Sequence, residues 1–364
     1  MAGNILNYYA GGNTARGFYS LYESNLEGLD RVFILKGGPG IGKSTMIKKL
    51  GQRWNEAGFD IEYLHCSSDT GSVDGLIIRS IGVGIVDGTA PHVIEPTAPG
   101  AIEEYINLGE AWDSKKLAHR KIEILELAHQ KKQAFETAYA TFNKALKIHD
   151  EWERYFIHNM SFERANKLAD ELIEKLFDGN TLTKQADVKH RFLGAATPVG
   201  AVDFVPNITE GLKKRYFIKG RPGSGKSTLL KKLVKHCEKT GYDVEVYHCG
   251  FDPHSLDMVV VRELGFAIFD STAPHEYFPS RDGDEILDMY DLTIREGTDE
   301  RYEKEIEKVS KQYSEKMKEA ISHLAEAKEW HLKLEAIYVN AMDYKVIDEK
   351  TEWIHEQMEK LVKH

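Results

Sequence analysis

Short apolar runs alternate with longer amphipathic stretches in two separate parts of the chain. Buried strands are predicted by the apolar runs near residues 32–36, 61–66 and 81–87, and again near residues 215–219, 244–249 and 264–270. The stretches between these runs place apolar residues at helical spacing, as Met46–Leu50 does after the first run. Alternating strands and helices predict an α/β fold, in which each part forms a parallel sheet with flanking helices.

Two long charged regions follow, at about residues 113–178 and 298–362, and both carry apolar residues at seven-residue spacing. The spacing is kept by Leu117, Ile124, Ala138, Ala145 and Trp152 in the first region, and by Ile306, Tyr313, Ala320, Ala327 and Leu334 in the second. Such heptads predict coiled-coil-like helices. Because shorter helices are predicted to start near Ser161 and Asp343, we expect each region to fold back as a helical hairpin arm. The pattern leaves open whether these arms project or cover the core.

The two parts are copies of each other. A shift of 183 residues aligns the chain with itself without gaps from about residue 8 to residue 92, and places Asp87–His92 on Asp270–His275. Two tandem units are therefore expected. The predicted divisions are a first core at 1–112, a helical arm at 113–178, a linker at 179–190, a second core at 191–297 and a second arm at 298–364.

Composition limits the classes of partner and the compartment. The formal net charge of −10 argues against a broad nucleic-acid surface. Three cysteines, Cys66, Cys237 and Cys249, are too few for a disulfide framework and suit a reducing compartment. Neither a signal peptide nor an apolar stretch long enough to span a membrane is evident. We therefore expect a cytoplasmic protein that acts without a membrane.

A glycine-rich loop of the form G-x-x-x-x-G-K-[ST] follows the first predicted strand of each unit. The two copies contain Gly37, Gly38, Pro39, Gly40, Ile41, Gly42, Lys43, Ser44 and Thr45, and Gly220, Arg221, Pro222, Gly223, Ser224, Gly225, Lys226, Ser227 and Thr228. Glycines let several backbone N–H groups point inward at phosphate oxygens, and the following helix directs its positive end at the same anion. The pattern predicts that Lys43 and Lys226 contact phosphates and that Ser44 and Ser227 ligate Mg²⁺.

An acidic residue at the end of a neighbouring strand is expected to complete each magnesium site. Asp87 and Asp270 end the apolar runs Ile81–Val86 and Leu264–Phe269, although either could instead begin a turn. Neither aspartate is followed by glutamate, so the base that would activate water is not identified. Candidates for that role are Asp69, Asp252, His92 and His275, and the histidines could equally be structural.

Two further repeated features are weaker candidates. His65-Cys66 and His248-Cys249 offer two zinc ligands each, which is too few without other partners, so buried strand ends are the preferred interpretation. Arg79 and Arg262 are the arginines that both cores share. Either could reach the phosphates of the other unit as an arginine finger, or simply lie on a solvated helix.

With its two loops, the chain resembles the P-loop NTPase superfamily over residues 31–92 and 215–275. The resemblance implies that Lys43 and Lys226 bind phosphates, that Ser44 and Ser227 bind Mg²⁺, and that Asp87 and Asp270 are the acids of the metal site. The tandem layout, with its Asp-x-Thr-Ala-Pro-His ends, also resembles poorly characterised bacterial proteins described as ATPases or nucleotide kinases. Three strands per core are fewer than the superfamily usually has.

The function expected from these residues is binding and hydrolysis of ATP at two magnesium sites. ATP is favoured because no N-K-x-D segment, typical of guanine recognition, is present. An ATPase would couple hydrolysis to movement of the arms or to a protein partner bound through them. A nucleotide or small-metabolite kinase is the alternative, with Arg281, Arg295 and Arg301 as lid candidates in the second unit. A nucleotide-sensing scaffold that barely turns over is the third.

Overall fold

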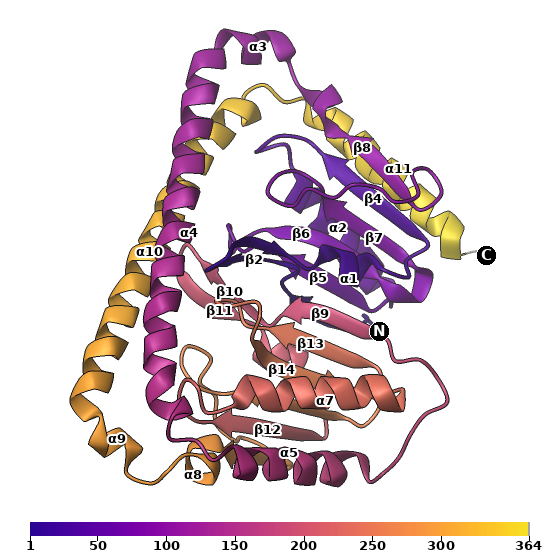
Figure 1. The fold of residues 1–364 in the computed structure, drawn as a ribbon. Coiled ribbons are helices and arrows are strands. Elements are labelled where there is room, and N and C mark those ends of the chain that lie inside the picture. The colour runs from indigo at the N-terminus through magenta and orange to yellow at the C-terminus, as the bar shows by residue number, and fades with distance from the viewer. Residues whose placement is uncertain (363–364) are drawn as a thin grey trace.

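The computed structural model describes residues 1–362, and a six-stranded sheet occupies the N-terminal part of the chain (Figure 1). In spatial order its strands are β1 (Ile5–Tyr8), β5 (Ile61–His65), β6 (Val73–Ile78), β7 (Val83–Asp87), β4 (Arg31–Lys36) and β8 (Glu103–Asn107). All run in one direction except β6, which is antiparallel to both of its neighbours. The α/β class is confirmed, whereas the prediction of a parallel sheet is wrong at β6, which replaces an expected helix.

A second six-stranded sheet has the same strand order. Its strands are β9 (Val188–Phe192), β13 (Val244–His248), β14 (Leu256–Val261), β15 (Phe266–Asp270), β12 (Lys214–Lys219) and β16 (Asp284–Asp288). Here β14 is the antiparallel strand. Strand β9 begins inside the segment that was predicted as a linker.

Short helices connect the strands. Each of α2 (Lys43–Glu56) and α7 (Lys226–Thr240) follows a phosphate-binding loop and packs on its own sheet. The remaining short elements are α1 (Tyr22–Leu26), η1 (Arg79–Ile81), η2 (Leu108–Ala111), α3 (Ser114–His119), α6 (Val205–Ile208), α8 (Met289–Thr293) and α9 (Thr298–Arg301). Among residues 1–362, no helix combines the length and the apolar character needed to cross a membrane.

A small third sheet joins the two copies. It consists of two hairpins, β2 (Gly11–Thr14) with β3 (Gly17–Ser20) and β10 (Gly194–Thr197) with β11 (Gly200–Asp203). The hairpins meet where Asn13 of β2 pairs with Ala196 of β10. These two residues occupy the same position in the repeat, so the copies are related by a local two-fold axis, as in an isologous dimer.

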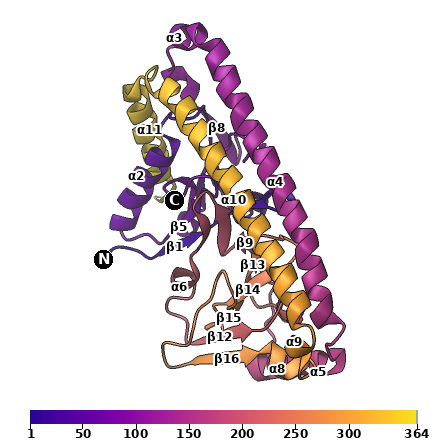
Figure 2. The same ribbon diagram turned by 90° about the vertical axis from the view of Figure 1, so that its left-hand side faces the viewer.

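Two helices of 37 residues each run along one side of the molecule, α4 (Lys121–Ile157) and α10 (Glu303–Val339). They lie side by side and in opposite directions in both views (Figures 1 and 2). Midway along the pair, Phe142 and Leu324 are buried against Ala15 and Ala196 of the joined hairpins. The long helices therefore cover the small sheet and span both copies.

The helices that follow them cross to the opposite sheet. After α4, helix α5 (Phe162–Phe177) packs on the second sheet, where Leu172 is buried with Leu233. After α10, helix α11 (Tyr344–Val362) packs on the first sheet, where Ile354 is buried with Leu50. The prediction that each arm folds back as a hairpin is therefore wrong. Each copy instead lends its last helix to the core of the other (Figure 1).

A buried ion network lies where the edge strands β1 and β9 of the two large sheets meet. The side chain of Arg191 is 3% exposed, and its guanidinium lies 3.1 Å from Glu62 and 3.3 Å from Glu245. It also stacks 4.2 Å above the ring of Tyr8, which holds the equivalent position in the first copy. Burial alone raises the pKa of Glu62, but Arg191 and Arg79 outweigh it and hold that pKa below its usual value. One cation from the second copy thus neutralises a carboxylate of each copy.

Replacing Arg191 by alanine is predicted to destabilise the protein by about 3 kcal/mol or more, because buried carboxylates lose a partner. The deficit is present at neutral pH. It shrinks in acid, since the lowered pKa of Glu62 means that its stabilising charge is lost as the pH falls through that pKa. Urea unfolding at a series of pH values measures both effects.

A surface ion pair provides the matched control for this prediction. Arg53 lies 2.8 Å from Glu352, and both side chains are about half exposed. Because such pairs contribute roughly 0–1 kcal/mol, Arg53→Ala is expected to leave the urea midpoint nearly unchanged. An equal loss of unfolding free energy in the two variants would show that the ion pairs of Arg191 contribute no more than an exposed pair.

Candidate nucleotide-binding sites

Each phosphate-binding loop connects a central strand to a helix. The first loop runs from β4 to α2 and the second from β12 to α7. Gly42 and Gly225 precede the helices with φ of 91° and 88°, a left-handed conformation that side chains disfavour. The helices then begin at Lys43 and Lys226, so their first free N–H groups face the loop. Both loops therefore have the local conformation needed to bind an anion.

The predicted lysines and aspartates lie close together in both copies. The amine of Lys43 is 3.5 Å from the carboxylate of Asp87, and that of Lys226 is 3.4 Å from Asp270. Asp87 ends β7, which pairs with the loop-bearing strand β4. The backbone N–H and hydroxyl of Thr89 both donate to its carboxylate, at 2.8 and 2.6 Å, and fix its direction. The second copy repeats this turn at Thr272.

The loop serines point at the same edge of each sheet. The hydroxyl oxygen of Ser44 accepts the N–H of Val73 at 3.0 Å, and Ser227 accepts that of Leu256 at the same distance. A hydroxyl and a carboxylate are the hard oxygen ligands that Mg²⁺ prefers. Ser44 with Asp87, and Ser227 with Asp270, therefore suit a magnesium ion.

Two buried aspartates that the sequence did not identify adjoin these groups. Asp74 follows Val73, and the register of β6 on β7 places it beside Asp87; Asp257 has the same position beside Asp270. Burial raises the pKa of Asp74 to about 6, with the charge of Asp87 acting in the same direction and His92 opposing both. Asp257 behaves alike. The signal was present, because the 183-residue shift aligns these aspartates, but only an antiparallel β6 brings Asp74 to the loop.

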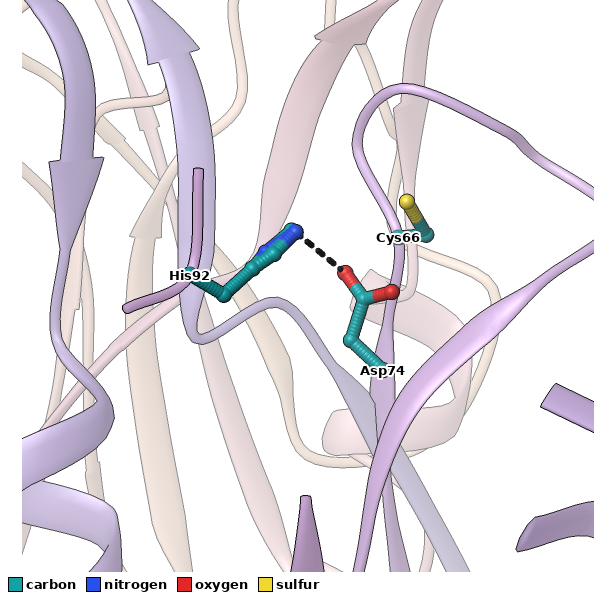
Figure 3. A group of neighbouring side chains, drawn as sticks. All are labelled: Cys66, Asp74 and His92. Atoms are coloured by element: carbon teal, nitrogen blue, oxygen red, sulfur yellow. Dashed lines mark ion pairs between the residues drawn. The ribbon is translucent and has the colours of Figure 1, made fainter. Parts of the chain in front are cut away.

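Cys66 and His92 surround Asp74 in the first copy (Figure 3). The Nε2 atom of His92 is 3.1 Å from the Asp74 carboxylate, and burial raises the pKa of the Cys66 thiol well above its ordinary value. In the second copy His275 instead turns its Nδ1 atom to Asp203, 2.8 Å away. His65 is not part of this group, because its ring forms a hydrogen bond with the side chain of Asn7. The structure therefore does not bring the His65-Cys66 pair together as zinc ligands.

The other proposed base and finger residues are engaged elsewhere. Asp69 lies 2.9 Å from Lys328 of α10, and Asp252 lies 2.8 Å from Arg16 of the first hairpin, so each receives a cation from the opposite copy. Arg79 and Arg262 bind Glu62 and Glu245 in the buried network between the sheets. Neither arginine is placed at a phosphate-binding loop.

The crossing helices form a roof over both loops. A Cβ atom placed on Gly40 would come within 2.8 Å of Cγ of Glu335 on α10, and one on Gly223 within 2.6 Å of the carbonyl oxygen of Glu153 on α4. Around the second loop lies a cavity of about 1290 Å³, lined by Lys226, Ser227, Asp270 and residues of α4. Its size is ample for a nucleotide. Sequence analysis missed this roof because nothing in the heptads says which loop a helix covers.

Strand, glycine loop and helix, with lysine, serine and aspartate converging at the end of the sheet, are the arrangement of a P-loop NTPase, and a family match supports membership of that superfamily. Residues 18–192, just under half of the chain, match the family model described as the KAP family P-loop domain. This match covers the first loop and the helices α4 and α5. No curated protein and no solved structure matches the chain significantly.

Changing Asp74 and Asp257 together to asparagine is predicted to raise roughly tenfold the Mg²⁺ concentration at which half of the ATP is bound. This is the effect of removing a carboxylate beside metal ligands. Titration of Mg²⁺ at fixed labelled ATP measures the shift. The exposed carboxylates Asp170 and Asp348, changed together in the same way, are the control and should leave the titration unmoved. An unchanged midpoint in the first variant would exclude the buried aspartates from the metal site.

Proposed function

We propose that the protein binds Mg-ATP at both loops and hydrolyses it. The observation that carries this proposal is that the two loops keep the same arrangement. Lysine to aspartate distances are 3.5 and 3.4 Å, and both serine hydroxyls accept a backbone N–H at 3.0 Å. A copy that had lost its function would be free to drift from this geometry. Two working sites explain why neither has done so.

Each chain group then has a defined task. The N–H groups of the loop bind the phosphate oxygens, and Lys43 or Lys226 moves from its present carbonyl partners to the terminal phosphates. Ser44 with Asp87, and Ser227 with Asp270, hold the Mg²⁺ ion, which when bound neutralises negative charge on the phosphates. The buried Asp74 and Asp257 add charge beside those ligands when they ionise.

Hydrolysis at either loop would be coupled to the long helices. The first loop touches α10 and the second touches α4, and these helices pack on each other along their length. A change of loop conformation on phosphate release therefore acts on a helix that begins in the other copy and packs on the other long helix. This arrangement supports coupling between the sites or to a protein partner bound along the helices.

The residues expected to form a kinase lid lie elsewhere. The Arg281 guanidinium donates to the carbonyl of Thr209 at 2.6 Å, and the Arg301 guanidinium lies over the ring of Tyr302. Among the described residues that line the cavity at the second loop, none is Arg281, Arg295 or Arg301. Hydrolysis without an acceptor is therefore preferred to phosphoryl transfer. The three free cysteines suit the reducing cytoplasm in which ATP is abundant.

Lys43→Ala and Lys226→Ala, made separately, are each predicted to remove about half of the bound ATP and part of the hydrolysis, since each removes a phosphate contact at one site. Equilibrium binding with labelled ATP and Mg²⁺ gives the stoichiometry, and phosphate release gives the rate. The double variant should bind no ATP at either loop.

Lys49 and Lys232, which lie on α2 and α7 away from the phosphates, provide the control pair. Their alanine variants should keep both the stoichiometry and the rate. If one loop variant were inert and the other fully active, the protein would have a single working site.

A further inference from the structure

A carboxylate that could activate water at the loops is missing from the positions directly after Asp87 and Asp270. The acids that the sequence suggested for this role, Asp69 and Asp252, are held by Lys328 and Arg16. Asp74 and Asp257 are buried within the sheets. Asp299 is held by Arg221 of the second loop. Each long helix also places a glutamate over a loop, because Glu335 of α10 packs on Gly40 and the backbone of Glu153 of α4 packs on Gly223.

These two glutamates occupy matching positions in the long helices. Each lies four residues after a histidine, as His149 to Glu153 and as His331 to Glu335. Residues at that spacing share a helix face. Burial, helped by the nearby loop lysine, lowers the pKa of His149 to about 4, and burial together with nearby lysines does the same for His331, so both rings are neutral at pH 7. A His-x-x-x-Glu pair therefore lies on the long helix that covers the phosphate-binding loop in each copy.

At the first loop, the side chain of Glu335 packs on Gly40, three residues before Lys43. Its Cγ atom would lie 2.8 Å from a Cβ on Gly40. Burial raises the pKa of its carboxyl, with Asp69 acting in the same direction while Lys43 and Lys328 oppose. A general base works best when its pKa lies near the working pH, so a raised pKa of the Glu335 carboxyl favours proton transfer.

At the second loop, Glu153 has the equivalent place. It lines the cavity together with Lys226 and Ser227. Burial raises the pKa of its carboxyl, and Asp150 adds to the rise, whereas the N–H of Gly223 and the charge of Lys226 oppose it. A glutamate therefore lies over the same loop position in both copies, Gly40 and Gly223, on a helix that begins in the other copy.

We propose that Glu335 at the first site and Glu153 at the second accept the proton of the attacking water; this rests on the proposed hydrolysis of ATP. The water oxygen bonds to the γ-phosphorus while the bond from phosphorus to the bridging oxygen breaks. ADP leaves with the electrons of that bond. The carboxylate takes one water proton and later releases it, so the products are ADP, inorganic phosphate and one proton.

Each site would then be completed by the opposite copy. The loop, lysine, serine and aspartate come from one repeat, whereas the base stands on the long helix that starts in the other. A helix shift that displaces a base by about 1 Å could lower the rate roughly 100-fold. Hydrolysis therefore requires that the two long helices be docked on both sheets.

The test reads one site at a time. In Lys226→Ala protein, which keeps only the first site, Glu335→Gln is expected to lower kcat by about 100-fold, with the KM for ATP changed less than about threefold. In Lys43→Ala protein, Glu153→Gln is expected to do the same at the second site. In Lys226→Ala protein, Glu335→Gln should lower kcat more than Glu153→Gln does. In Lys43→Ala protein, Glu153→Gln should have the larger effect. Formate is expected to restore part of the rate to the corresponding Glu→Ala variants.

Controls separate a base from a structural role. Glu151 and Glu329 are exposed acids on the same helices, and their glutamine variants should keep the wild-type rate. Binding of labelled ATP with Mg²⁺ is measured for every variant. Lost binding, or an unchanged kcat in the Glu335 and Glu153 variants, would overturn the assignment while the proposed function stands. Failure of the wild type to bind ATP would overturn the proposed function itself, and the assignment with it.

Discussion

The exchange of helices between the two copies is the constraint on which the rest of the structure depends. Helix α5 completes the core of the second sheet and α11 that of the first, so neither core is closed by its own repeat. To reach the opposite sheet, α4 and α10 pass along the whole molecule (Figure 2). This course brings each of them across the loop of the other copy. Apolar burial drives the exchange. The helices α5 and α11 are amphipathic, and without them one face of each large sheet would be exposed.

Local patterns were enough to group the residues of each glycine-rich loop with the aspartate of the neighbouring strand. The loop motif specifies its own conformation through Gly42 and Gly225, and an aspartate at the end of a buried neighbouring strand must reach the same edge. Lys43, Ser44 and Asp87 could therefore be grouped from the sequence. The direction of β6 could not, because Asp74 and Gly75 interrupt its apolar run and nothing local distinguishes a strand that returns from a helix that crosses over.

The destination of the long helices was also hidden, for a different reason. Heptads state that a helix has an apolar seam but not which partner fills it. Since the two cores are copies, the apolar face of α5 suits either sheet, and only chain length and the geometry of the connection decide. His149 interrupts the apolar seam of the first long helix. Its match with His331, and that of Glu153 with Glu335, identifies the interruption as a conserved feature of the two arms within this chain and not as a packing defect.

Fusion of the two copies into one chain allows what a symmetric dimer cannot. Tyr8 and Arg191 hold equivalent positions close to the local axis, and the ring of one lies under the guanidinium of the other. In a dimer of identical chains this place would contain two arginines, which repel, or two tyrosines, which would leave Glu62 and Glu245 without their shared cation. The same freedom explains Asn13 opposite Ala196, where the Asn13 amide donates to the carbonyl and hydroxyl of Ser67 in its own copy and to the carbonyl of Ala196 in the other. Sequence divergence on the axis therefore strengthens the join, while the loops and the roof glutamates, which lie away from it, keep their likeness.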